Sequence, residues 1–180
     1  GDVGSGKTRV ALFSALTAVE AGAQVAIMAP TEILARQLHA NLFEALSKVG
    51  VRIDILPGRD KAAARRPVLA GCAEGAIKIL IGTHGLFQEG VTFRNLGLVI
   101  IDEQHRFGVH QRLALGQKGE APHMLLMSAT PIPRSMVLAL YGDLDISKLL
   151  NKPAGRQPIK TLVKPLDQWG EVAQALRRAI

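Results

Sequence analysis

The chain has few cysteines, few aromatic side chains and no long apolar runs. Its single cysteine, Cys72, excludes an internal disulfide and a cysteine-rich metal cluster, a composition that suits a reducing cytoplasm. Aromatic residues make up only 4% of the sequence, which argues against a base-stacking platform for single-stranded nucleic acid. The longest apolar runs, such as LGLVII, have the length of a strand and are far shorter than a membrane span. We therefore expect a cytoplasmic protein with no membrane partner.

Positive charge is in excess. The 22 Lys and Arg residues outnumber the 15 Asp and Glu residues, giving a formal net charge of +7. Such an excess favours a polyanionic partner such as nucleic acid. The basic run GRDKAAARR (58–66) is interpreted as a solvated helix face, with a phosphate contact as the alternative. For a second basic run, HRFGVHQR (105–112), the sequence allows two roles, a contact between domains or a contact to nucleic acid.

Segments of helical and strand-like pattern alternate along most of the chain. Helices are predicted at 7–21, at about 31–49 with Thr31 as the N-cap, and at 60–75, where Pro67 should kink or split the helix. The expected buried strands are 24–29, 51–56, 77–82, 96–102 and 123–130. Near-continuous apolar strands separated by helices are typical of a parallel sheet covered on both faces. The predicted fold class is therefore α/β.

A domain boundary is expected near NKPAGRQP (151–158), where two prolines and a glycine interrupt the pattern. Beyond it come one strand-like run (159–165) and one amphipathic helix (167–180). So few residues cannot bury a core of their own. We therefore expect one domain over 1–152, and a linker with the start of a second domain over 153–180.

The first eight residues, GDVGSGKT, fit the phosphate-binding loop pattern G-x-x-x-x-G-K-[ST]. In such a loop backbone N–H groups surround phosphate oxygens, the lysine reaches the β- and γ-phosphates, and the hydroxyl residue binds Mg²⁺. The loop normally follows a buried strand, so we expect the first domain to lack its first strand here. The predicted nucleotide-binding residues are Gly1, Asp2, Val3, Gly4, Ser5, Gly6, Lys7 and Thr8.

Two carboxylates follow the apolar run of LVIIDEQH (98–105). Asp102 ends a predicted buried strand, at the edge where ligands bind in open α/β sheets, and it is the expected partner of Thr8 in holding Mg²⁺. Glu103 is predicted to act as the general base toward a water that attacks the γ-phosphate. The phosphate loop and this acidic pair, in this order, argue against a chance match.

Hydroxyl residues follow three other predicted strands. Ser128 and Thr130, in MSATPIPR (127–134), are suited to relaying the presence of the γ-phosphate. Thr31, in APTEILARQ (29–37), and Thr83, in IGTHGLF (81–87), are predicted contacts to a nucleic-acid backbone, which is bound through hydroxyl and N–H groups.

With these segments the chain resembles the superfamily 2 DNA helicases, and among them the first motor domain of enzymes that remodel branched DNA. The most specific marks are GDVGSGKT, MAPTEILARQ, IIDEQHRFGVHQR and SATPIPR, which together span most of residues 1 to 152. The resemblance implies a RecA-like P-loop NTPase domain. It also implies ATP and Mg²⁺ as cofactors, Lys7 on the nucleotide, Asp102 and Glu103 in hydrolysis, and Gln104, His105, Ser128 and Thr130 in coupling.

For the whole protein, the resemblance implies ATP-driven regression of forks and processing of Holliday junctions in recombination and repair. Its implied partners are branched DNA and a second motor domain of the same chain, with the protein acting as a monomer. A motor domain of a transcription-repair coupling factor-like translocase is the nearest alternative, although Gln104 stands where a second Glu is expected there. Because the second motor domain supplies arginine fingers, we expect the isolated chain to be inactive.

Two further alternatives come from other classes. A GTPase would need an Asn-Lys-x-Asp segment, and the Asn-Lys of NKPA (151–154) lacks the Asp. A small-molecule kinase gives no account of DEQH together with SAT. A nucleotide- or DNA-binding module without turnover remains an alternative for the isolated chain.

Overall fold

The computed structural model of the protein describes residues 1, 4–58, 62–88, 90–102, 122–129, 145–150, 161 and 163–179. The helices are α1 (Lys7–Glu20), α2 (Glu32–Lys48), α3 (Ala62–Ala73) and α6 (Trp169–Ala179), with two 3₁₀ helices, η1 (His84–Phe87) and η3 (Leu166–Gln168). The strands are β1 (Gln24–Met28), β2 (Ile53–Ile55), β3 (Ile79–Gly82), β4 (Leu96–Ile101) and β5 (His123–Leu126).

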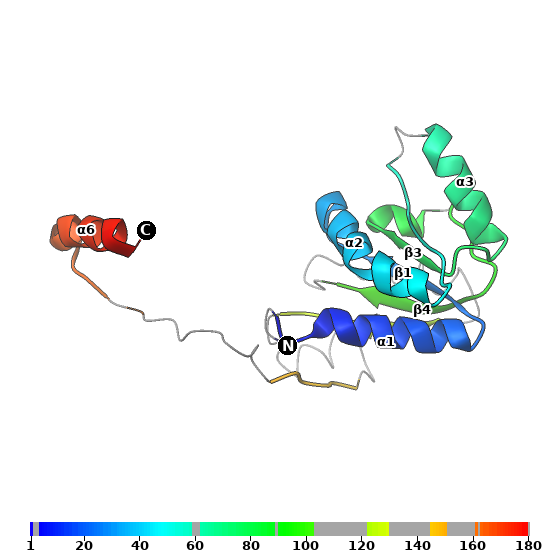
Figure 1. Ribbon diagram of the computed structural model, residues 1–180, viewed down its shortest axis with the longest axis horizontal. Helices are drawn as coiled ribbons and strands as arrows, with labels where there is room; N and C mark the ends of the chain where they lie inside the picture. The colour runs from blue at the N-terminus through cyan, green and yellow to red at the C-terminus, as the bar shows by residue number, and fades with distance from the viewer. Residues whose placement is uncertain are drawn as a thin grey trace.

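The five strands form one parallel sheet in the order β2-β3-β1-β4-β5. Figure 1 labels three neighbouring strands of this sheet, β3, β1 and β4. The central strand β1 is buried along its whole length, as expected for a parallel sheet with both faces covered. Alternate residues of β1 enter different cores: Val25 and Ile27 join one, and Ala26 and Met28 the other. The α/β fold class predicted from the sequence is confirmed.

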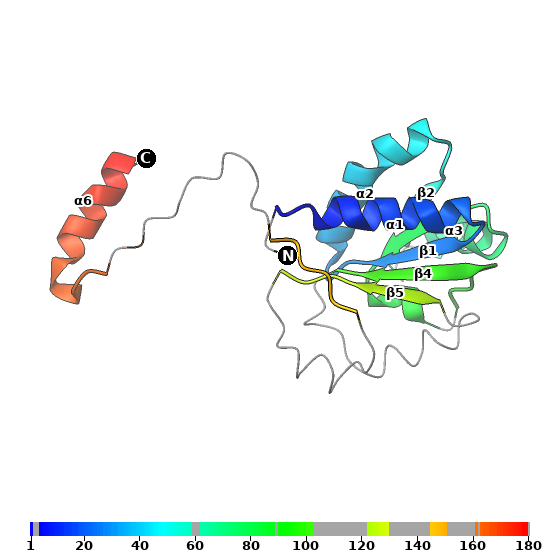
Figure 2. The same ribbon diagram turned by 90° about the horizontal axis from the view of Figure 1, so that it is seen from below.

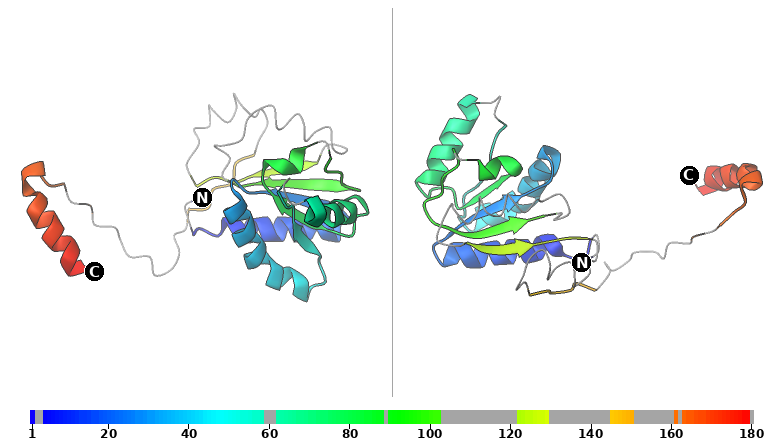
Figure 3. Two further views of the ribbon diagram at one scale, coloured as in Figure 1. Left: turned by 90° about the horizontal axis from the view of Figure 1, so that it is seen from above. Right: turned by 180° about the vertical axis from the view of Figure 1, so that it is seen from behind.

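Helices cover both faces of this sheet. Ala11 and Ala15 of α1 and Leu42 of α2 belong to one core, while Val68 and Cys72 of α3 belong to the other. Figure 3 shows α1 and α3 on opposite sides of the strands. Small alanines on α1 let its backbone approach the sheet closely, which fixes the helix over β1 and β4.

The helix boundaries follow local chemistry. The hydroxyl of Thr31 accepts a hydrogen bond from the Leu34 N–H (3.3 Å), so the predicted N-cap of α2 is confirmed. At its other end α2 closes with Lys48, a cation at the negative end of the helix dipole.

Pro67 was predicted to kink or split its helix; the structure corrects the split, and the kink stays a prediction. Pro67 lies inside the single helix α3. A proline removes one N–H, here the one that would bond to the carbonyl of Ala63. Both residues are exposed, so water can satisfy that carbonyl and the helix continues.

The strand expected at 159–165 is also corrected. Its described residues, 161 and 163–165, have no regular secondary structure, and Val163 is 94% exposed. A strand needs a neighbour for its backbone N–H and C=O groups. The helix that follows is present as α6, with Trp169 67% and Leu176 56% exposed.

None of the helices in the described part of the chain combines the length and the apolar character that a membrane crossing requires.

Candidate functional site

The phosphate-loop residues lead directly into α1. Gly6 is its N-cap with φ 99° and ψ 15°, and Gly4 also has a positive φ of 80°. Both values lie in the left-handed region, which glycine enters without steric cost. Lys7 is the first residue of α1, and its Nζ donates to the carbonyl oxygen of Gly1 (2.7 Å), so the ammonium group lies over the loop.

The start of α1 lies at the carboxyl edge of the sheet. Because α1 returns antiparallel to the strands and enters β1 through a short turn, its first turn lies where the strands end. Figure 2 shows the marked N-terminus and the start of α1 at that end of β1, β4 and β5. The Gly1 amino nitrogen lies 3.0 Å from the carbonyl oxygen of Ser128, just beyond β5.

Asp102 follows β4 at this same edge. Its N–H donates to the carbonyl oxygen of Met28 (3.0 Å), which extends the ladder between β1 and β4 by one residue. The N–H of Met127 donates to the carbonyl oxygen of Ile101 (2.9 Å), which extends the pairing of β4 and β5 by one residue and positions the backbone just before Ser128. Asp102 and Ser128 are half-buried, so the sheet holds their backbones while their side chains reach partly into solvent.

Thr31 and Thr83 lie on the other half of the edge. The N–H of Ala29 donates to the carbonyl oxygen of Gly82 (2.9 Å), which aligns the ends of β1 and β3. Along the edge the order is Thr83, Thr31, Asp102 and Ser128, following the strand order β3-β1-β4-β5. Neighbouring strands are about 4.8 Å apart, so Asp102 and Thr83 lie on the order of 10 Å apart across the edge. The predicted nucleotide residues and nucleic-acid residues therefore occupy adjacent halves of one edge.

A close approach fixes the position of Thr83. A β-carbon on Gly82 would lie 2.9 Å from Leu86 Cγ and 3.3 Å from Leu56 Cβ, so η1 packs directly on the end of β3. Thr83 is the N-cap residue of η1, but its side chain makes no capping hydrogen bond. Beside it is a hollow of about 170 Å³, which we call the Thr83 hollow. Its lining includes Glu32, Pro57, Arg65, Thr83, His84 and Gln88.

The residues present fit a nucleotide phosphate with Mg²⁺. Ser5 Oγ is buried and has no hydrogen-bond partner in the described part of the chain, which leaves a polar atom inside the loop to be satisfied. Thr8 is exposed at the start of α1 and Asp102 is half-buried at the strand end. The described residues contain no cluster of three or more metal-ligating side chains. Mg²⁺ is commonly held by one or two protein groups together with phosphate oxygens and water, and the Thr8 hydroxyl and the Asp102 carboxylate are groups of that kind.

Several predicted site residues lie outside the described residues. They are Asp2, Val3, Glu103, Gln104, His105 and Thr130. Their assigned roles stay predictions from the sequence.

Arg65 lines a hollow at the sheet edge although the sequence did not predict it as a site residue. Arg65 belongs to the basic run that was interpreted as a solvated helix face, yet it is half-buried and lines the Thr83 hollow. The sequence signal was the charge itself, whereas the position of Arg65 opposite Thr83 depends on packing between segments that are distant in the chain.

Comparison with known proteins agrees with this geometry. Residues 1–137 match the DEAD/DEAH box helicase family. The chain is 54% identical to the ATP-dependent DNA helicase RecG of Acidithiobacillus ferridurans over 92% of this chain and 24% of that protein. It is 51% identical to the RecG of Haemophilus influenzae over 99% of this chain and 26% of that protein. The chain thus spans about a quarter of the length of these relatives.

A solved structure of RecG bound to a three-way DNA junction matches 98% of this chain and 24% of that chain, with a TM-score of 0.81 and 45% identity. This match, together with the parallel sheet, confirms the predicted RecA-like fold. The more specific resemblance stated from the motifs, to helicases that remodel branched DNA, agrees with these RecG relatives. The chain belongs to the DEAD/DEAH box helicase family.

Proposed function

We propose that this chain is the first motor domain of an ATP-driven DNA helicase that remodels branched DNA. The observation that carries the proposal is the shared carboxyl edge, where the phosphate loop, Asp102 and Ser128 adjoin Thr31 and Thr83. A motor must connect hydrolysis to DNA movement, and adjacent halves of one sheet edge provide a short path for that connection. The RecG relatives, one of them bound to a three-way junction, support branched DNA as the substrate.

In the proposed reaction a water attacks the γ-phosphorus of ATP and the bond to the β–γ bridging oxygen breaks, giving ADP and phosphate. Lys7 binds the β- and γ-phosphates, and Glu103 accepts the proton of the attacking water. Thr8 and Asp102 would hold Mg²⁺, which when bound neutralises charge on the β- and γ-phosphate oxygens. Gln104, His105, Ser128 and Thr130 are proposed to couple the state of the γ-phosphate to the DNA side.

We also propose the organisation of the whole protein. Residues 1–152 form the first motor domain, and 153–180 form a linker and the start of the second. The second motor domain and branched DNA are the proposed partners, with the protein acting as a monomer in recombination and repair.

The proposal is tested by replacing Lys7 in the complete protein. Lys7→Ala removes the cation that binds the phosphates, so it should weaken ATP binding and abolish strand separation on a three-way DNA junction. Lys48→Ala is the matched control, since Lys48 is exposed at the far end of α2 and pairs with Glu44 (2.7 Å). Full junction unwinding by the Lys7→Ala protein would overturn the proposal. ATP turnover by the unaltered protein without strand separation would favour a translocase instead.

A further inference from the structure

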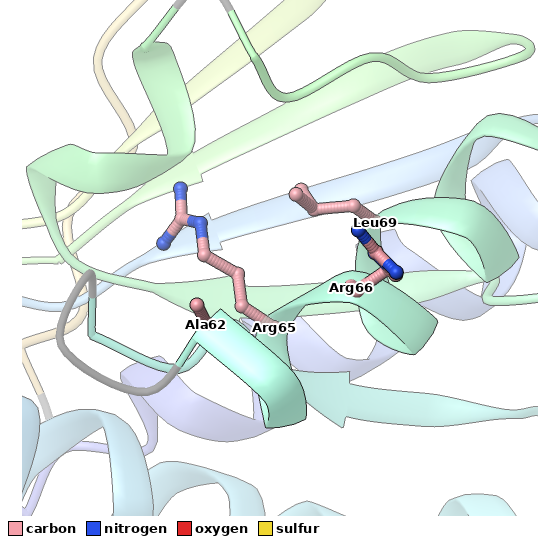
Figure 4. Close-up of a pocket in the computed structure, with 4 residues that line it drawn as sticks. All are labelled: Ala62, Arg65, Arg66 and Leu69. Carbon is pink, nitrogen blue, oxygen red and sulfur yellow. The ribbon is translucent and has the colours of Figure 1, made fainter.

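Arg65 lies at the junction of two hollows on the surface of the sheet domain. It lines the Thr83 hollow together with Pro57 and Gln88. It also lines a more open hollow with Ala62, Arg66 and Leu69, shown in Figure 4. There the Arg65 side chain extends from α3, and its guanidinium group lies well away from that of Arg66.

The Arg65 side chain is held in position. Its Nη1 donates to the carbonyl oxygen of Pro57 (2.7 Å), in the segment that follows β2. The helix that bears it is anchored in the core by Val68 and Cys72, which are 8% and 0% exposed. A guanidinium whose position is fixed before binding loses less conformational freedom when it meets a ligand.

Among the described residues, no carboxylate lies within ion-pair distance of the Arg65 guanidinium group. Glu32, the acidic residue that lines the same hollow, pairs instead with Arg36 (2.7 Å) on the next turn of α2. The lining of the Thr83 hollow thus combines Arg65 and Thr83 with Glu32, whose carboxylate is already paired with Arg36.

The size of the Thr83 hollow indicates the kind of ligand. At about 170 Å³ it is smaller than the roughly 300–1,000 Å³ typical of pockets that enclose small molecules. One phosphate group of a strand running along the sheet edge would fit there. A guanidinium offers five N–H donors, of which one is used on Pro57, and its planar fork matches two phosphate oxygens.

We infer that Arg65 binds a backbone phosphate of the DNA strand in the Thr83 hollow, opposite the Thr83 hydroxyl. This inference rests on the proposed DNA helicase function. It assigns Arg65 a role in affinity for the strand whatever its sequence, since a phosphate contact carries no base information.

The test compares neighbouring arginines in the complete protein, with a forked DNA as the probe and affinity measured over a series of salt concentrations. Arg65→Ala should weaken binding about ten-fold or more and reduce the slope of log K against log[salt] by about 1. Arg66→Ala is the matched control, because it removes the same charge one residue away but does not line the Thr83 hollow. It should weaken binding by less than about three-fold.

Equal losses for Arg65→Ala and Arg66→Ala would overturn the inference, since they would show a general effect of charge. Unchanged affinity and slope for Arg65→Ala would overturn it as well. Failure of the unaltered protein to bind forked DNA would instead overturn the proposed function, and the inference with it. Loss of the hydrogen bond to Pro57 could unfold Arg65→Ala, which a lower melting temperature would show. In that case the inference is tested by comparing the DNA affinities of Arg65→Lys and Arg66→Lys. A lysine keeps the charge but not the fork, so only Arg65→Lys should lose affinity.

Discussion

Gly6 has a backbone conformation that side chains with a β-carbon rarely adopt. Its φ of 99° is what turns the phosphate loop into α1, although nothing lies within 4 Å of where a β-carbon would stand. Gly6→Ala should therefore cost about 1–2 kcal/mol through backbone strain and not through a clash. Urea denaturation measures this, with Gly90→Ala as the control, because Gly90 has equal space and no positive φ. Equal stability of the two variants would contradict the argument from strain.

The predicted role of Glu103 as the general base can be tested by a single substitution. Replacing Glu103 with glutamine keeps the size and polarity of the side chain but removes its ability to accept a proton. In the complete protein Glu103→Gln should bind ATP almost normally and hydrolyse it about 10² times more slowly or worse, since a positioned base contributes about 10²–10⁴. Measured turnover within a few-fold of the unaltered protein would show that Glu103 is not the base.

At the scale of the elements, Gln24 ties three segments together at the amino edge of the sheet. It is 2% exposed, and its Nε2 donates to the carbonyl oxygens of Cys72 and Ile77 (both 2.8 Å). Its Oε1 accepts from the Asn95 N–H (2.9 Å). One side chain in β1 thus satisfies backbone groups at the end of α3 and at the entries to β3 and β4.

Gln24→Met should therefore destabilise the protein by about 2–4 kcal/mol, because it leaves buried polar backbone groups without partners. Gln37→Met, at an exposed position of α2, is the control and should change the free energy of unfolding by less than about 0.5 kcal/mol. Chemical denaturation of both variants measures the difference. A small effect at Gln24 would mean that water replaces its hydrogen bonds.

The elements themselves were largely predictable, because their signals are local. The apolar run 24–29 predicted β1, and Thr31 predicted the start of α2. The role of Gln24 was not predictable, since its partners lie 48 to 71 residues away and the run reads as simply apolar. The expected split at Pro67 was wrong for a related reason: whether a proline breaks a helix depends on whether the lost hydrogen bond faces water or the core. The order of the strands was not predictable either, because neighbouring strands such as β1 and β4 are distant in the sequence.

At the scale of the whole molecule, the sheet edge separates two proposed activities. Asp102 follows β4 on the nucleotide half, and Thr83 follows β3 on the DNA half, with β1 between them. The sequence predicted both residues individually, but not that they share one edge two strands apart. In the complete protein Asp102→Asn should therefore abolish ATP hydrolysis while leaving affinity for forked DNA within a few-fold.

Thr83→Ala should do the reverse, lowering DNA affinity while ATP hydrolysis without DNA stays close to normal. Loss of one hydroxyl contact to a phosphate costs about 0.5–1.5 kcal/mol, which corresponds to an affinity lower by roughly two- to ten-fold. Measuring ATPase activity and DNA binding for both variants gives four values. Equal damage to both activities by either variant would contradict the division of the edge.

The net charge of +7 leads to a prediction about the domain as a whole. Each duplex phosphate that a Lys or Arg side chain neutralises releases condensed counterions, so log K should fall against log[salt] with a slope near −0.9 for every such charge contact. The proposed contacts of Thr31 and Thr83 are uncharged, so the charge contact proposed beside this half of the edge is that of Arg65, which lines the Thr83 hollow from α3. Affinity of the complete protein for forked DNA should thus fall steeply between about 50 and 200 mM salt. Titrations at several salt concentrations measure the slope. A flat response would show that binding does not depend on neutralising backbone phosphates, and the phosphate contact proposed for Arg65 would then be wrong.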